Sequence, residues 1–181
     1  MVKIKHVFLD MDGVIVEFMD AALAQLGFDL DRNKVTYWDY LYQKTGVSKR
    51  AFWENFPREF WINLKFTREA SDLLTVLERY EPILFTVPTI SNAGWKQEWI
   101  RKNLPRFFAE GRYMIGPRKE WAAHSRSVLI DDGEHNIGTW REAGGFGILF
   151  PRPWNSLRKM EPFAVAWVKD QLEYFERGEV V

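Results

Sequence analysis

Short apolar runs recur along the chain and are separated by amphipathic stretches. Five of these runs, rich in β-branched and aromatic residues, predict strands at about residues 5–9, 82–87, 112–115, 127–130 and 146–150. Apolar residues at helical spacing lie between the later runs, around Leu73, Trp99 and Trp140, and a last helix is predicted at about residues 163–175. Nearly continuous apolar strands that alternate with helices indicate an α/β fold, a parallel sheet with helices on both faces.

The segment at residues 17–72 interrupts this alternation. It contains no convincing strand, is punctuated by Gly27 and Gly46, and is rich in tryptophan and phenylalanine. Structureless loops of this length are uncommon inside compact domains, so the segment is interpreted as a small helical insert. We therefore expect an α/β core made of residues 1–16 and 73–181, and a helical cap made of residues 17–72.

Composition narrows the function classes. At 181 residues the chain can bury one core together with a small insert. Its 25 basic and 25 acidic residues give a formal net charge of +0, which argues against an electrostatic nucleic-acid binder. The lack of cysteine excludes disulfides, zinc–thiolate sites and a cysteine nucleophile. No signal-peptide pattern or membrane-spanning run is present, so we expect a cytoplasmic protein without a membrane partner.

Polar residues follow three of the predicted strands directly. In an open parallel sheet, ligands bind beyond the carboxyl ends of the strands, so residues at those ends are expected to share one crevice. The candidates are Asp10, Asp12 and Gly13 after the first strand, Thr86 at the end of the second, Asp131 and Asp132 after the fourth, and Lys119 shortly before the fourth. Paired carboxylates repel each other, and such a group persists where a hard cation or a reaction requires it.

This ordered set resembles the haloacid dehalogenase superfamily of phosphohydrolases. A closer resemblance is to the 5′(3′)-deoxyribonucleotidases and their phage and bacterial relatives, through the stretches at residues 10–18, 84–88, 128–132 and 153–155. The resemblance covers nearly the whole chain and implies a Rossmann-like core with a small cap after the first strand. One departure is Val87, because these relatives commonly have serine after the strand-end threonine, which leaves only a backbone amide there for phosphate.

The resemblance also implies a role for each strand-end residue. Asp10 would be the nucleophile that forms an aspartyl-phosphate, and Asp12 the general acid and base. Mg²⁺ would be held by Asp10, by the backbone carbonyl of Asp12 and by the Asp131–Asp132 pair. We expect the direct bond from Asp132 and support from Asp131, although the sequence leaves that order open. Two further residues would act on the phosphoryl group: Thr86 by holding its oxygens and Lys119 by balancing its charge.

The aromatic residues of the cap are candidates for substrate binding. Phe18 lies where the chain leaves the core and is expected to overhang the site. By resemblance, Tyr37, Trp38 and Trp53 match positions that line a base pocket, and aromatic faces stack well on nucleobases. The competing interpretation is that these rings only fill the interior of the cap.

Several residues have a simpler interpretation. Lys96 and Arg118 are weaker candidates for phosphate contacts and are better explained as surface charges. The three histidines, His6, His124 and His135, have no ligand-like spacing and are interpreted as structural or surface residues. The stretch at residues 152–155 is most simply a turn before the last helix.

The function predicted from these observations is Mg²⁺-dependent hydrolysis of nucleoside monophosphates, with pyrimidine deoxyribonucleotides favoured. Alternatives are the same chemistry on another small phosphate ester or on a nucleic-acid 3′-phosphate, which the neutral charge disfavours, and a nucleotide-binding module without turnover. A monomer or homodimer acting on a small nucleotide is expected, and a nucleic-acid partner is not.

Overall fold

The structure, a computed structural model, describes residues 3–29, 31–37, 39–46, 48–89 and 91–179. Trp38, one of the residues expected to bind substrate, therefore lies outside the described residues. No helix in the described part of the chain is long and apolar enough to cross a membrane.

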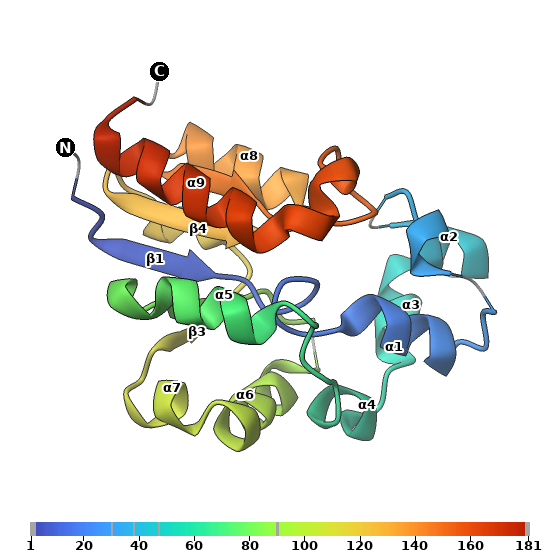
Figure 1. Cartoon of the computed structure of the whole chain (residues 1–181). Coiled ribbons are helices and arrows are strands. Elements are labelled where there is room, and N and C mark those ends of the chain that lie inside the picture. Colours follow the sequence, from blue (N-terminus) through green and yellow to red (C-terminus); the bar gives the residue numbers. More distant parts are fainter. Residues whose placement is uncertain (1–2, 30, 38, 47, 90, 180–181) are drawn as a thin grey trace.

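A five-stranded parallel sheet forms the centre of the molecule (Figure 1). Its strands are β1 His6–Leu9, β2 Ile83–Thr86, β3 Tyr113–Ile115, β4 Ser127–Asp131 and β5 Phe146–Leu149. They lie in the order β3-β2-β1-β4-β5, and every pairing is parallel. The five apolar runs of the sequence are these five strands, so the predicted α/β sheet is confirmed.

The register aligns the carboxyl ends of the three central strands. Leu9 of β1 lies opposite Leu84 of β2 and Ile130 of β4. The backbone N–H of Asp10 then donates to the carbonyl oxygen of Ile130 at 2.9 Å. Because neighbouring parallel strands end together, the polar residues that follow them meet at one edge of the sheet.

Helices cover both faces of the sheet, as the alternation along β1 requires. Val7 and Leu9 belong to the larger buried cluster, which includes residues of α5 Ala70–Leu77, α6 Ala93–Asn103 and α9 Ala164–Arg177. Phe8 points to the other face, where it packs with Ile137 and Trp140 of α8 Glu134–Glu142. Successive side chains of a strand alternate between faces, so each face buries its own apolar set. Three short elements complete this part: η2 Glu78–Tyr80, α7 Pro105–Ala109 and η4 Arg158–Phe163.

The described elements between residues 18 and 62 are all helical. They are α1 Phe18–Gln25, η1 Arg32–Lys34, α2 Tyr40–Thr45, α3 Lys49–Glu54 and α4 Arg58–Ile62, and in Figure 1 they lie beyond the carboxyl ends of the strands. We call the segment at residues 17–69 the cap. The expected boundary at residue 72 falls inside α5, and this helix contacts α9 of the core.

The two linkers that join the cap to the core run side by side. The backbone N–H of Thr67 donates to the carbonyl of Ile15 at 3.0 Å, and that of Glu17 donates to the carbonyl of Lys65 at 2.8 Å. The Thr67 hydroxyl also donates to the Val14 carbonyl at 2.8 Å. Entry and exit of the cap are thus held together as a short paired segment.

A histidine pair lies at the opposite end of the sheet. Nδ1 of His6, the first residue of β1, lies 3.0 Å from Nε2 of His124, and one ring must be the donor and the other the acceptor. The structural interpretation of these two histidines is therefore confirmed. Partial burial lowers the pKa of both rings, and the cations of Lys5 and Arg126 lower it further.

This pair predicts a loss of stability in mild acid. The neutral rings are favoured in the folded chain, whereas the unfolded chain takes up protons near the ordinary pKa of about 6.5. The contribution of the pair to the free energy of unfolding is complete above pH 6.5. It is lost as the pH falls through the lower pKa values of the two rings in the folded chain. Thermal unfolding between pH 7.5 and 5 should show a smaller decrease in Tm for His124→Gln than for the wild type. His135→Gln, at an exposed position, is the control and should behave as the wild type does.

Candidate active site

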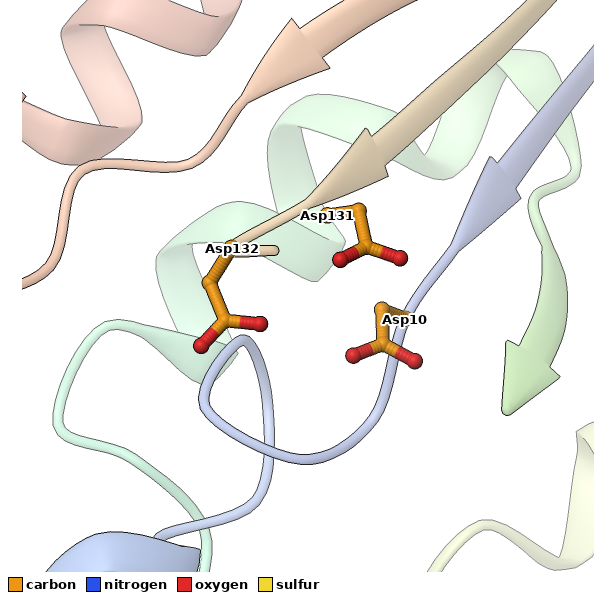
Figure 2. A group of neighbouring side chains, drawn as sticks. All are labelled: Asp10, Asp131 and Asp132. Carbon is orange, nitrogen blue, oxygen red and sulfur yellow. The ribbon is translucent and has the colours of Figure 1, made fainter. Parts of the chain in front are cut away.

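Three buried carboxylates form the centre of the site (Figure 2). Asp10 follows β1, Asp131 ends β4 and Asp132 comes next, and one oxygen from each lies within 4.8 Å of the others. Burial raises the pKa of Asp10 to about 7, against the lowering effect of Lys119 and with the support of Asp131 and Asp12. Burial, together with the neighbouring Asp131 and Asp10, raises the pKa of Asp132 well above its ordinary value. Burial and mutual repulsion therefore disfavour the negative charges of these two carboxyls.

Lys119 is the cation closest to this cluster. It begins the short helix η3 Lys119–Ala122, is fully buried, and donates to Asp10 Oδ1 at 2.5 Å and to Asp131 Oδ2 at 2.6 Å. Burial by itself would lower the pKa of the ammonium, but the two carboxylates outweigh it and raise the pKa above its ordinary range. Lys119 is therefore protonated at neutral pH and lies against the predicted nucleophile.

Lys96 is a second buried lysine, and its interpretation as a surface charge is wrong. Its side chain is only 3% exposed, and Nζ donates to Asp12 Oδ2 and, at 2.8 Å, to Thr86 Oγ1. Nζ also lies 5.3 Å from the centre of the Trp61 ring in the cap. The sequence held one signal, because Lys96 falls in the first turn of the helix that follows the Thr86 strand end. Arg118, in contrast, is an exposed charge paired with Glu120, as expected.

The charges of the site fit a divalent cation. Asp10, Asp12, Asp131 and Asp132 supply four carboxylates. Two ammonium groups contact three of them: Lys96 contacts Asp12, and Lys119 contacts Asp10 and Asp131. An all-oxygen donor set with excess negative charge suits Mg²⁺ or another hard cation.

The loop after β5 is part of the site rather than a simple turn. The Trp154 indole donates to Asp132 Oδ2 at 2.6 Å, and the Asn155 amide donates to the backbone carbonyls of Asp132 and Phe150 at 3.0 and 2.8 Å. Arg152, fully buried, donates through Nε to the Gly13 carbonyl. This loop therefore connects the end of β4 with the turn after β1.

Gly13 is required by that turn. Its φ of +80° is a conformation that L side chains rarely adopt, and a Cβ there would come within 2.2 Å of Asp132 Oδ2. The glycine after the two aspartates therefore leaves room for the carboxylate of Asp132.

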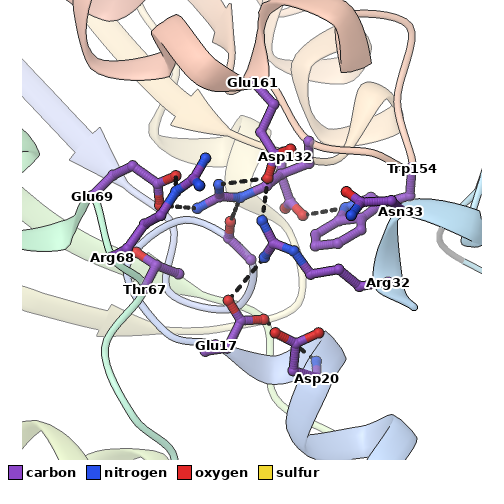
Figure 3. A network of polar contacts seen from close by, with 12 residues as sticks. Glu17, Asp20, Arg32, Asn33, Thr67, Arg68, Glu69, Asp132, Trp154 and Glu161 are labelled. Atoms are coloured by element: carbon purple, nitrogen blue, oxygen red, sulfur yellow. Dashed lines mark hydrogen bonds and ion pairs between the residues drawn. The ribbon is translucent and has the colours of Figure 1, made fainter. Parts of the chain in front are cut away.

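A network of ion pairs joins the cap and its linkers to the core (Figure 3). Arg32 of the cap contacts Glu17 at 2.9 Å and also pairs with Glu161 of η4. Arg152 of the core contacts Glu69 at 3.3 Å and approaches Glu161 within 3.7 Å. Glu161 is shared by one arginine from each side, so it fixes the position of the cap over the sheet.

A cavity of about 860 Å³ lies between the sheet edge and the cap. Its floor includes Asp10, Asp12, Thr86, Val87, Lys119 and Asp132, and its cap side includes Tyr37, Gln43, Arg50, Trp53 and Trp61. This volume is within the range of small-molecule sites. The predicted residues Tyr37 and Trp53 therefore face the same space as the strand-end acids.

Phe18 occupies a different position from the one expected. Its ring is 2% exposed, lies 5.3 Å from the Trp53 ring and stacks on Trp61 at 5.6 Å between ring centres. It is packed behind these two rings instead of overhanging the site. Phe18 therefore packs behind the residues that line the cavity. The number of aromatic residues in the cap could not show which of them line the cavity and which support it.

The loop after β2 holds two buried polar atoms that find no hydrogen-bond partner in the described part of the chain. They are Thr89 Oγ1 and Asn92 Nδ2, and both residues line the cavity. Buried polar groups are rarely left unpaired, so these atoms have unused hydrogen-bonding capacity near Thr86 and Val87.

Comparison with solved structures defines the fold class. A haloacid dehalogenase-like protein of unknown function from Agrobacterium tumefaciens superposes with a TM-score of 0.59 at 15% identity, over 98% of this chain and 100% of that one. A haloacid dehalogenase family hydrolase from Deinococcus radiodurans, solved with bound phosphate and sodium, superposes with a TM-score of 0.52 at 19% identity. The match covers 88% of this chain and 89% of that one. The core therefore has the haloacid dehalogenase-like, Rossmann-type α/β fold, as the sequence predicted.

The family model for the "5' nucleotidase, deoxy (Pyrimidine), cytosolic type C protein" family matches residues 3–173. The chain belongs to this family and is a hydrolase that acts on phosphoric monoesters. A search of curated proteins finds no match.

Proposed function

We propose that the protein is a Mg²⁺-dependent nucleotidase that hydrolyses nucleoside monophosphates, preferring pyrimidine deoxyribonucleotides, through an aspartyl-phosphate. The observation that carries the proposal is the shared cavity, in which Asp10, Lys119 and Asp12 face Trp53 and Tyr37. This arrangement supports phosphoryl chemistry next to an aromatic surface for a base. We further propose that it acts in the cytoplasm as a monomer or homodimer.

Asp10 is the nucleophile in this proposal. A carboxylate oxygen of Asp10 bonds to phosphorus while the bond from phosphorus to the ester oxygen breaks. Lys119, in contact with Asp10 and Asp131, orients the attacking carboxylate and balances charge on the phosphoryl oxygens. Mg²⁺, held by Asp10, Asp132 and the Asp12 carbonyl, would screen the repulsion between the two anions.

Asp12 moves the proton in both half-reactions. It gives a proton to the departing ester oxygen, and then accepts one from the water that attacks phosphorus and releases Asp10 and inorganic phosphate. Lys96 contacts both Asp12 and Thr86, so it holds the acid beside the residue that binds the phosphoryl group. Lys96 also adds positive charge where the phosphate is held.

The loop after β2 supplies the remaining phosphate contacts in this proposal. Serine is replaced by Val87, but the unpaired atoms Thr89 Oγ1 and Asn92 Nδ2 lie close by in the sequence and in the cavity wall. Together with the backbone amide of Val87 and with Lys96, they offer donors to phosphate oxygens at the start of α6, where anions are favoured.

A panel of phosphate esters tests the proposal. Phosphate release should require Mg²⁺ and be fastest with pyrimidine deoxynucleoside monophosphates, compared with ribonucleotides, sugar phosphates and a 3′-phosphorylated oligonucleotide. Release from sugar phosphates alone would keep the catalytic roles and refute the nucleotide preference. Tight nucleotide binding without release would favour the binding module instead.

The role of Trp53 can be tested separately from the chemistry. Trp53→Ala should raise KM for nucleotides about tenfold, because stacking of a base on an aromatic ring contributes about 1–3 kcal/mol. KM for a small aliphatic phosphate ester, which has no base, should stay nearly constant. Steady-state kinetics with both substrates make the comparison, and equal increases in the two KM values would contradict base stacking.

A further inference from the structure

Trp154 makes a polar contact that the proposed reaction has not used so far. The residue is only 4% exposed, and its indole N–H donates to Asp132 Oδ2 at 2.6 Å. That distance is at the short end for an N–H donor. The indole therefore holds one oxygen of a carboxylate in the acidic cluster.

The two neighbouring aspartates are held in different ways. Asp131 Oδ1 accepts from the Gly133 N–H at 2.8 Å, its Oδ2 accepts from Lys119 at 2.6 Å, and the Asn136 amide lies within 3.1 Å of both oxygens. For Asp132, the described hydrogen bonds involve Oδ2 alone. Asp131 is occupied by protein donors, whereas Asp132 keeps one oxygen for another partner.

The orientation of Asp132 also depends on its surroundings. Figure 2 shows one of its carboxylate oxygens directed toward Asp10 and Asp131. The main chain of Asp132 is fixed by the Asn155 amide at 3.0 Å, but rotation of an aspartate carboxylate is soft. Asp132 Oδ2 lies where a side chain at position 13 would otherwise be, and the hydrogen bond from Trp154 holds it there.

We propose that Trp154 is a positioning residue for the divalent cation. By holding Oδ2, it directs the other oxygen of Asp132 into the space shared with Asp10. This inference rests on the proposed Mg²⁺-dependent function. Groups that hydrogen-bond to a metal ligand commonly change metal affinity about 10- to 100-fold when they are removed.

Mg²⁺ binding measured by calorimetry tests this inference. Trp154→Phe removes the N–H and keeps a ring in the same place, so the Kd for Mg²⁺ should increase about tenfold. The matched control is Trp167→Phe, which removes an indole bond to the Leu149 carbonyl at 3.1 Å, outside the cluster. Its Kd should equal that of the wild type. At saturating Mg²⁺, kcat of Trp154→Phe should recover toward the wild-type value.

A second variant separates the loss of the indole hydrogen bond from a loss of folding. Trp154→His keeps a ring N–H, and it should bind Mg²⁺ more tightly than Trp154→Phe does; thermal unfolding confirms that each variant is folded. Wild-type affinity in Trp154→Phe, or equal weakening in Trp154→His and Trp154→Phe, would overturn the inference alone. Failure of the wild-type protein to bind Mg²⁺ would overturn the proposed metal dependence together with it.

Discussion

Asp10→Asn should abolish phosphate release, lowering kcat by at least about 10³-fold, because an amide cannot serve as the nucleophile toward phosphorus. The variant keeps the size and shape of the buried side chain, and Lys119 retains its bond to Asp131 at 2.6 Å. The fold should therefore persist. Phosphate release from the preferred nucleotide, measured beside thermal unfolding, separates loss of chemistry from loss of structure.

The matched control for Asp10→Asn is Asn136→Ala. Asn136 donates to both oxygens of Asp131 at 3.0 and 3.1 Å and lines the cavity, but has no reacting atom in the proposed mechanism. Its kcat should fall much less. Activity of Asp10→Asn within tenfold of the wild type would contradict the assignment of the nucleophile.

Lys96→Met should lower kcat about 10²-fold, the smaller end of what a correctly placed general acid contributes. The variant removes the ammonium that contacts Asp12 and Thr86, and keeps a long side chain that can pack against Trp61. The proton-transferring carboxylate then loses its fixed partner, and the phosphoryl site loses a positive charge. KM for the nucleotide should also increase, because Thr86 is no longer held.

Lys102→Met is the control for Lys96→Met. Lys102 belongs to the same helix, but it is exposed and its nearest described bond, to Asn63, is 3.4 Å long. Steady-state kinetics should give wild-type values for this variant. Similar kcat values for the two lysine variants would show that Lys96 has no role in turnover.

The sequence predicted the sheet well because the signal for it is local. Each apolar run carries its own strand tendency, and Asp10, Thr86 and Asp131 follow or end three of those strands. Parallel pairing then brings their side chains to one edge without further information. The fold class and the family followed from this local pattern and from the order of the acidic residues.

Lys96 and Trp154 show why the rest of the site could not be read from the sequence. A lysine is buried only where carboxylates meet it, and the partner of Lys96 is Asp12, 84 positions away. Trp154 looked like part of a turn because its partner, Asp132, follows β4 and lies 22 positions earlier in the chain. The prediction for Phe18 was wrong for a different reason. In a cap rich in aromatic residues, the sequence does not show which rings line the cavity and which pack behind it.

The paired linkers of the cap have a consequence for how this enzyme can diversify. The chain leaves and re-enters the core at adjacent points, which are joined by the hydrogen bonds of Thr67 to Ile15 and of Glu17 to Lys65. The cap is therefore an insertion that is connected to the core by one pair of neighbouring linkers. A longer, shorter or differently folded module could replace it while the separation of the strands stays the same. Under the proposed function, the residues for base binding and those for bond breaking therefore lie in separate stretches of the chain, so selection can alter one while preserving the other.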